Sequence, residues 1–404
     1  MVWSMKVLVL IRRTALICAA ALAMSLAAAR DSSRDQIPAS AFSKLIQDFS
    51  EEEGYFFSDN IISNEDGYLT ILNKLRELRV AGGAYIGVGP EQNFTYIAKI
   101  RPAIAFLVDI RRQAIIQHLM YKALFHLSKS RGEFLSRLLG RRLAGKDAPG
   151  ANSTISELTE YFSAAPADES YYASNLAEVE RTIQTEFAFP LSTEDRASLV
   201  RVSRSFYTDG MNLSFQFRYS RRGGFFMPSM RDLIEQVDPD GKPGNFLAKA
   251  EDYQFVRDLH ERNRIIPVVG DFAGPKALKS IAGYLRSHSY KVNVFYTSNV
   301  EMYLFQNGAF DYFVKNVTAF PTTPKSLFIR SANNRGVWPP PGYRMSTMLQ
   351  YISVFLKDHQ DGLYTDYWTL LRTHSIPLIP QRYKGKKKAA IVLSAASHYD
   401  IIFF

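Results

Sequence analysis

The feature that most constrains the fold is a series of short apolar runs, separated by stretches with helical spacing. These runs cover 84–86, 104–108, 265–269, 292–296 and 326–330, and each ends close to glycine or a polar residue. Continuous apolar runs of this length are typical of strands buried on both faces. Strands that alternate with helices favour a parallel sheet covered by helices. The sequence therefore predicts an α/β fold with a doubly wound, mostly parallel, Rossmann-like sheet.

Helical patterns fill the intervals between these runs. The spacing of apolar residues predicts helices over 39–79 (with a polar loop inside), 94–99, 112–139, 275–288, 300–314 and 344–357. Asn64 is a predicted N-cap, because Glu65 and Asp66 follow it in what would be the first turn. Two apolar tail segments, 389–393 and 400–404, are candidate closing edge strands.

The middle of the chain breaks the alternation. It is rich in small and polar residues and carries helical patterns over 153–163, 168–186 and 193–206. We therefore expect residues 30–140 to form N-terminal helices and the first half of the sheet domain. Residues 141–255 would form a large helical insertion or cap, and residues 256–404 the second half of the domain.

The N-terminus has the pattern of an export signal. Lys6, Arg12 and Arg13 precede an uncharged apolar run over 14–29, and that run ends in three alanines. Residues 1–29 are therefore expected to be a signal peptide or a membrane anchor, which implies an exported, periplasmic or membrane-anchored protein with membrane association through this segment. The alternative is that the segment does not export. The single cysteine, Cys18, lies within it, so the chain after residue 29 could form no disulfide and no thiolate metal site.

The charge balance is mildly basic. The net charge is +10, and it would be +7 for a chain that starts at Arg30. This excess suits an anionic ligand or membrane surface, and no specific nucleic-acid binding is expected. The seven histidines show no metal-ligand spacing, and His118 is expected to be a packed or surface residue. No metal site is predicted, and the P-loop and α/β-hydrolase motifs are absent.

Glycines and carboxylates stand where the predicted strands end. In open α/β sheets, ligands bind at this edge. Gly87 and Gly89 follow the first strand and would let the backbone approach a ligand, and Asp109 ends the second strand, where it suits ribose hydroxyls. Asp271 follows the next strand and could meet an adenine. The alternatives stay open: a tight turn at the glycines, a helix cap at Asp109 and a simple turn at Asp271.

The glycine loop discriminates among nucleoside cofactors. A nicotinamide fingerprint has a third glycine where this sequence has Gln92, and Glu91 would repel a pyrophosphate. A sulfonium cofactor has no phosphate and carries a positive charge, so it tolerates Glu91 or benefits from it. We therefore expect Glu91 at a cofactor site for a small-molecule nucleoside with a sulfonium.

At the strand ends the sequence resembles class I S-adenosylmethionine-dependent methyltransferases. The motifs that carry the resemblance are YIGVG at 85–89, VD at 108–109, GD at 270–271 and YTSN at 296–299. The sequence around the first two motifs also resembles that of an uncharacterised bacterial family of that fold. The resemblance covers most of 40–335 outside the insertion, and it rests on the order and spacing of motifs that are individually weak.

The resemblance implies a seven-stranded sheet of the methyltransferase type and S-adenosylmethionine as cofactor. It implies methionine contacts at Gly87 and Gly89, ribose contact at Asp109 and adenine contact at Asp271, and Ser298 is a further cofactor candidate. The sequence departs from the family where the third glycine is missing. It also departs after the fourth strand, where no amino-methylating Asp/Asn-Pro-Pro-Tyr motif follows, so the methyl acceptor is not named.

Candidate residues for chemistry lie on the same edge. Asn299 could orient an amine or hydroxyl, and Glu301 or Asp271 could act as a base. The polar segment 58–65, which contains Asn60 and Asn64, would cover the cofactor and touch the acceptor, or be an ordinary capped loop. Arg111 and Arg112 could bind an acceptor carboxylate or form a solvated face. The expected function is methyl transfer to an unknown acceptor; the alternative is an exported, non-enzymatic binding or scaffold protein.

Overall fold

A computed structural model describes residues 36–215, 227–333 and 342–378. Its six described strands form one sheet in the order β3-β2-β1-β4-β5-β6. Neighbouring strands are parallel from β3 through β5, and β6 is antiparallel to β5. The chain therefore has an α/β fold with a mostly parallel, mixed sheet. The resemblance implied seven strands, and the tail segments 389–393 and 400–404 lie outside the described residues.

All five strands predicted from apolar runs are present. They are β1 (Ala84–Gly87), β2 (Ile104–Asp109), β3 (Ile265–Val269), β4 (Val292–Ser298) and β5 (Thr322–Asn333). Strands β1, β2 and β3 are buried at every residue, which explains their unbroken apolar sequence.

The predicted helix over 344–357 is wrong in its first half. Residues Met345–Tyr351 form β6, and helix α15 (Ile352–Gln360) starts only afterwards. The backbone of β6 pairs with β5 from Leu327 to Asn333, so hydrogen bonding to the sheet outweighs the local helical spacing.

The remaining helices mostly follow the sequence pattern. The predicted helix over 39–79 is two separate helices, and Asn64 lies between them rather than at an N-cap. The helix over 112–139 is broken near Ser130, which caps α6, and the helix over 300–314 is also two helices. The described helices before β3 are α2 (Ala39–Phe49), α3 (Leu72–Glu77), α4 (Gln92–Ile100), α5 (Arg112–Leu127), α6 (Arg131–Leu139), α7 (Ile155–Ala164), α8 (Glu169–Thr185), α9 (Thr193–Asp209), the short 3₁₀ helix η1 (Gly210–Asn212), α10 (Met230–Glu235) and α11 (Ala250–Glu261). Those after β3 are α12 (Ala277–Ser287), α13 (Val300–Gln306), α14 (Phe310–Thr318) and α16 (Tyr367–Arg372), besides α15.

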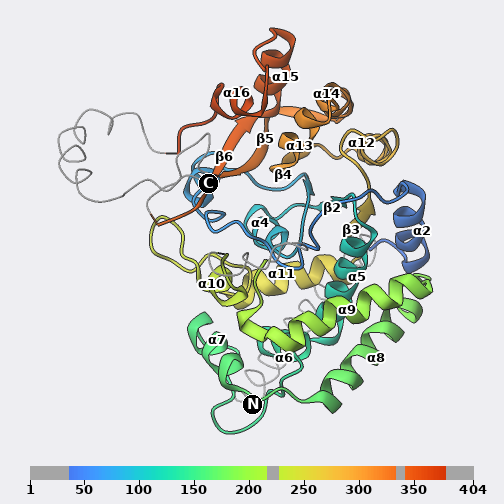
Figure 1. The fold of residues 1–404 in the computed structure, drawn as a ribbon, viewed down its shortest axis with the longest axis vertical. Helices are drawn as coiled ribbons and strands as arrows, with labels where there is room; N and C mark the ends of the chain where they lie inside the picture. The colour runs from blue at the N-terminus through green and yellow to red at the C-terminus, as the bar shows by residue number, and fades with distance from the viewer. Residues whose placement is uncertain (1–35, 216–226, 334–341, 379–404) are drawn as a thin grey trace, which may run out of the picture.

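Two groups of helices lie on opposite sides of the strands (Figure 1). Helix α11 packs against α4 and α5 on one side, and α12 packs against α2 and α14 on the other. Phe106 of β2 stacks on Phe49 of α2 and meets the edge of Tyr284 of α12. This two-sided cover buries the sheet and leaves its strand ends as the place where the fold opens.

The helices between β2 and β3 extend the molecule at one end. Helices α8 and α9 pack on α5, and α7 packs on α6 and α10, away from the β5–β6 edge (Figure 1). Residues 1–29 lie outside the described residues. Within the described ranges, no helix combines the length and apolar character needed to cross a bilayer.

Candidate functional site

A cavity of about 260 Å³ lies at the carboxyl ends of β1, β2, β3 and β4. The strand order reverses between β1 and β4, so this is the switch point at which open α/β sheets bind ligands. Its volume is just below the roughly 300–1,000 Å³ of typical small-molecule sites. The cavity walls come mainly from four strand ends and one N-terminal segment. The lining residues are 88–90, 108–111, 270–272, 296 and 298–300 at the strand ends, 55–57, 60 and 62–65 before β1, and also Phe215, Tyr303, Leu304 and Asn307.

The turn after β1 is held by Asn93, a residue that the sequence did not single out. Its Nδ2 contacts the carbonyl oxygens of residues 88, 89 and 90 at 2.8–3.0 Å, and its Oδ1 accepts a hydrogen bond from Tyr85 Oη at 2.9 Å. A Cβ on Gly87 would overlap Asn93 Oδ1 and lie 2.7 Å from the Tyr85 ring. Gly87 does not line the cavity, so the prediction of ligand contact there is wrong, and its small size serves the packing of Asn93.

Gly89 does line the cavity. Its φ is +82°, and a Cβ would meet nothing within 4 Å, so the backbone faces open space. Its carbonyl accepts from His118 Nε2 at 2.9 Å. Burial lowers the pKa of His118 to about 4, so the imidazole is neutral near pH 7. His118 is thus a packed residue that supports the turn.

Asp109 lines the cavity as predicted, but its carboxylate is already paired. Arg111 donates from Nε to Oδ1 at 2.9 Å and from Nη2 to Oδ2 at 2.7 Å, and its backbone N–H also donates to Oδ1. A carboxylate has about four lone-pair sites, so one on Oδ2 is left for a ligand hydroxyl. Arg111 lies along the cavity wall as a buried partner of Asp109, not as a free group for an acceptor carboxylate.

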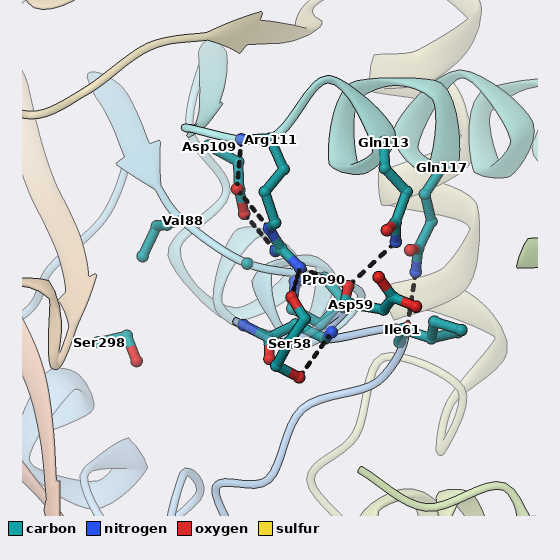
Figure 2. A network of polar contacts seen from close by, with 12 residues as sticks. Ser58, Asp59, Ile61, Val88, Pro90, Asp109, Arg111, Gln113, Gln117 and Ser298 are labelled. Carbon is teal, nitrogen blue, oxygen red and sulfur yellow. Dashed lines mark hydrogen bonds and ion pairs between the residues drawn. The ribbon is translucent and has the colours of Figure 1, made fainter. Parts of the chain in front are cut away.

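Side chains of α5 and its N-cap fix the segment 58–61, which carries Asn60 at the wall of the cavity (Figure 2). Arg111 Nη1 donates to the carbonyls of Ser58 and Asp59. Gln113 Nε2 donates to Asp59 O at 3.0 Å, and Gln117 Nε2 donates to Ile61 O at 2.6 Å. The wall is thus held through its backbone by three long polar side chains from one direction.

Two residues of the cavity have left-handed backbone without being glycine. Ser298 ends β4 with φ +53°, and Asn60 has φ +44°. Such conformations are costly and cluster at functional sites. The Oδ1 atom of Asn60 is buried and has no hydrogen-bond partner within the part of the chain that the structure describes. The predicted residues Asn64 and Asn299 also line the cavity.

Asp271 lines the cavity at the end of β3 and stabilises a turn. Its Oδ1 accepts from Ala273 N at 2.9 Å. Glu51 accepts hydrogen bonds from the backbone N–H groups of Asp271, Lys276 and Ala277. The backbone donors at the start of α12 therefore already have a side-chain acceptor. The predicted position of Asp271 is therefore correct, and its carboxylate is partly used.

Glu301 is not at the cavity, so its prediction as a base is wrong. Its side chain is fully buried and accepts from Arg330 Nε at 2.8 Å and from Thr297 Oγ1 at 3.0 Å. The helix that begins after β4 turns this residue toward β5 rather than toward the rim. The carboxylate is part of a buried ion pair in the protein interior.

Glu91 and Arg112 are also misplaced by the sequence prediction. Glu91 lines a separate cavity of about 20 Å³ with Tyr121, and burial raises its pKa to about 7. Arg112 lies outside the main cavity and forms a two-pronged ion pair with Asp195 of α9 at 2.9 Å. It joins α5 to the helices that precede β3.

The cavity contains one acid that the sequence analysis did not assign. Glu65 is 2% exposed, and its Oε1 accepts from Ser298 Oγ while its Oε2 accepts from Gln92 Nε2 at 2.8 Å. Burial raises its pKa. Gln92 stands where the third glycine was expected, and its amide also lies 3.2 Å from Tyr296 Oη. Among the described residues, no three acids, histidines or cysteines gather as a metal site.

The sequence matches one protein family, described as a domain of unknown function (DUF7790), over residues 60–374. The chain belongs to this family. The match spans all six described strands and the cavity lining from residue 60 onward, while the cavity residues 55–57 precede it. No curated protein matches the sequence.

Proposed function

We propose that this protein binds S-adenosylmethionine in the cavity at the switch point and is a methyltransferase of unnamed acceptor. The observation that carries the proposal is the convergence of Gly89, Asp109, Asp271 and Ser298, from four strand ends, on one cavity. The methyltransferase type of the sheet is part of the same proposal.

The residues at the cavity fit such a ligand in two respects. The open space at Gly89 leaves room for a ligand against the backbone, and the unpartnered Asn60 Oδ1 can accept a hydrogen bond. In the proposed complex, Asp271 would contact the adenine and Asp109 a ribose hydroxyl through its remaining lone pair. Gly89 would lie against the methionine half.

The cofactor would supply an activated methyl group on a sulfonium. The protein would then need only to align an acceptor and exclude water. Aromatic side chains line the cavity for this purpose: Phe56 packs on Phe57 with 4.5 Å between ring centroids and on Tyr303 at 5.4 Å. Asn299, at the start of α13, is the polar group we assign to orienting the acceptor.

Calorimetry on the full chain tests the proposal. We expect saturable heat with S-adenosylmethionine and with its demethylated product. Asp109→Asn should weaken both, because it removes the charge that holds Arg111 as well as a ribose acceptor. Arg112→Ala, on the same turn but outside the cavity, is the matched control and should bind as the wild type does. A folded wild-type sample that gives no heat at high micromolar ligand would refute the proposal.

A second candidate is a non-enzymatic binding or scaffold protein. The pairing of Asp109 with Arg111 favours it, because this ion pair holds the segment 58–61 through Arg111 Nη1 whether or not a ligand is bound. This candidate predicts that the folded chain binds no adenosyl compound and that Asp109→Asn lowers stability alone.

A further inference from the structure

Glu65 is a buried carboxyl group on the cavity wall with no cation beside it. Its hydrogen-bond partners are neutral: the hydroxyl of Ser298, the amide of Gln92, and the hydroxyls of Tyr296 and Ser331. Within the described ranges, no lysine, arginine or histidine forms an ion pair with it. An unpaired buried carboxylate is costly to a protein, so stability does not explain this residue.

The titratable groups that face Glu65 cannot balance its charge. They are Tyr85 on β1, Tyr96 on α4, Tyr296 on β4 and Tyr367 on α16. Burial raises the pKa of all four well above that of free tyrosine, so they are neutral at physiological pH. The other buried acid of the cavity, Asp109, differs because Arg111 neutralises it.

The position of Glu65 along the sheet edge indicates which part of a ligand would supply a positive charge beside its carboxylate. Asp271 follows β3 and Asp109 ends β2, and these two would hold the adenosine half of the ligand. Glu65 lies beyond them, between the end of β4 at Ser298 and the first turn of α4 at Gln92. The half of the ligand that extends past the ribose would reach this place.

We infer that Glu65 binds a positively charged centre in the methionine half of S-adenosylmethionine, either the sulfonium or the α-ammonium. The inference rests on the proposed function and adds to it a residue that selects the ligand by charge. Because burial raises the pKa of Glu65 and a bound cation would lower it again, binding would favour the ionised carboxylate and release the proton of any protonated fraction.

The test compares three ligands by calorimetry on the full-length wild type, Glu65→Gln and Glu91→Gln. Glu91→Gln is the matched control, because Glu91 is a carboxyl with a raised pKa that faces the other cavity. S-adenosylmethionine carries both cationic centres, S-adenosylhomocysteine carries only the ammonium, and methylthioadenosine carries neither. We expect Glu65→Gln to weaken S-adenosylmethionine by about tenfold to a hundredfold and methylthioadenosine by less than about twofold.

Each result has one meaning. An equal loss for S-adenosylhomocysteine assigns the ammonium, and an unchanged affinity for it assigns the sulfonium. Equal effects on all three ligands, or none, overturn the inference and leave the proposed function standing. No binding of any ligand by the wild type overturns the proposed function and this inference together. If Glu65→Gln does not fold, Glu91→Gln alone should bind S-adenosylmethionine more tightly as pH rises, whereas a flat profile would overturn the inference.

Discussion

Substitution of Gly87 by alanine would show what the glycine pair does. The added Cβ would overlap Asn93 Oδ1, so the Asn93 side chain would have to leave its position. Its Nδ2 has two hydrogens, so that displacement breaks two donated bonds and the one accepted from Tyr85, at about 1 kcal/mol each. Overpacking adds about 1–3 kcal/mol. We expect Gly87→Ala to lower the free energy of unfolding by about 4–6 kcal/mol in total.

Gly89→Ala is the matched comparison. Its Cβ would meet nothing within 4 Å, so only the left-handed backbone opposes it, at about 1–2 kcal/mol. Urea denaturation followed by circular dichroism measures both variants. The double variant Gly87→Ala/Asn93→Ala should be less destabilised than the sum of its single changes, because the overlap is gone. If Gly87→Ala costs no more than Gly89→Ala, the packing explanation of Gly87 is refuted.

Three other substitutions have distinct expected outcomes. Burial raises the pKa of Glu91 to about 7, so the folded state holds this proton more tightly than the unfolded state does. The free energy of unfolding of the wild type should therefore fall relative to that of Glu91→Gln between pH 4.5 and 7, by up to about 3 kcal/mol. Urea midpoints of the two proteins that stay parallel across that pH range would contradict this. Glu301→Gln leaves the Arg330 guanidinium buried without its counter-ion and should cost about 3–5 kcal/mol in urea denaturation, while a loss below about 1 kcal/mol would show that the pair is not needed. Arg112→Ala removes a partly exposed ion pair with Asp195 and should cost about 1 kcal/mol, and a change in ligand affinity would disprove its place outside the cavity.

The strands could be predicted from sequence because burial on both faces forces an unbroken apolar run. That signal is strong at Ile265–Val269, where every residue is buried. It fails for β6, because Met345, Met348 and Leu349 of this strand and Ile352, the first residue of α15, have the three- and four-residue spacing of a helix. The conformation of an edge strand depends on hydrogen bonds to the neighbouring strand, and the local sequence pattern does not show which segment that neighbour is.

Most of the site residues that could be predicted end a strand or follow one closely, while Asn60 and Asn64 were predicted from the polar segment before β1. Gly89, Asp109, Asp271 and Ser298 were found by this rule because parallel strands end at one edge. The rule failed for Glu301, because its partner Arg330 is 29 residues away and the sequence around Glu301 does not predict this ion pair. It also failed for Gly87, whose constraint is the packing of Asn93.

Glu65 was not assigned to the site, although its segment 58–65 was, because the residue was interpreted as an acid in the first turn of a helix that Asn64 would cap. One signal was available, since Gln92 replaces the glycine expected at the third position of the loop. A long amide at that place serves to reach a second residue, and in the structure that residue is Glu65. A departure from a motif can therefore indicate a new contact rather than a lost function.

The attachment of segment 58–61 to α5 has a consequence for how ligand preference could change. Arg111, Gln113 and Gln117 hold this segment by its peptide carbonyls, so its course depends on these side chains and not on the side chain of Asn60. Asn60 can then be exchanged for another residue that accepts left-handed backbone without moving the chain. Mutational libraries aimed at a new specificity should randomise Asn60 and leave the three anchoring side chains intact.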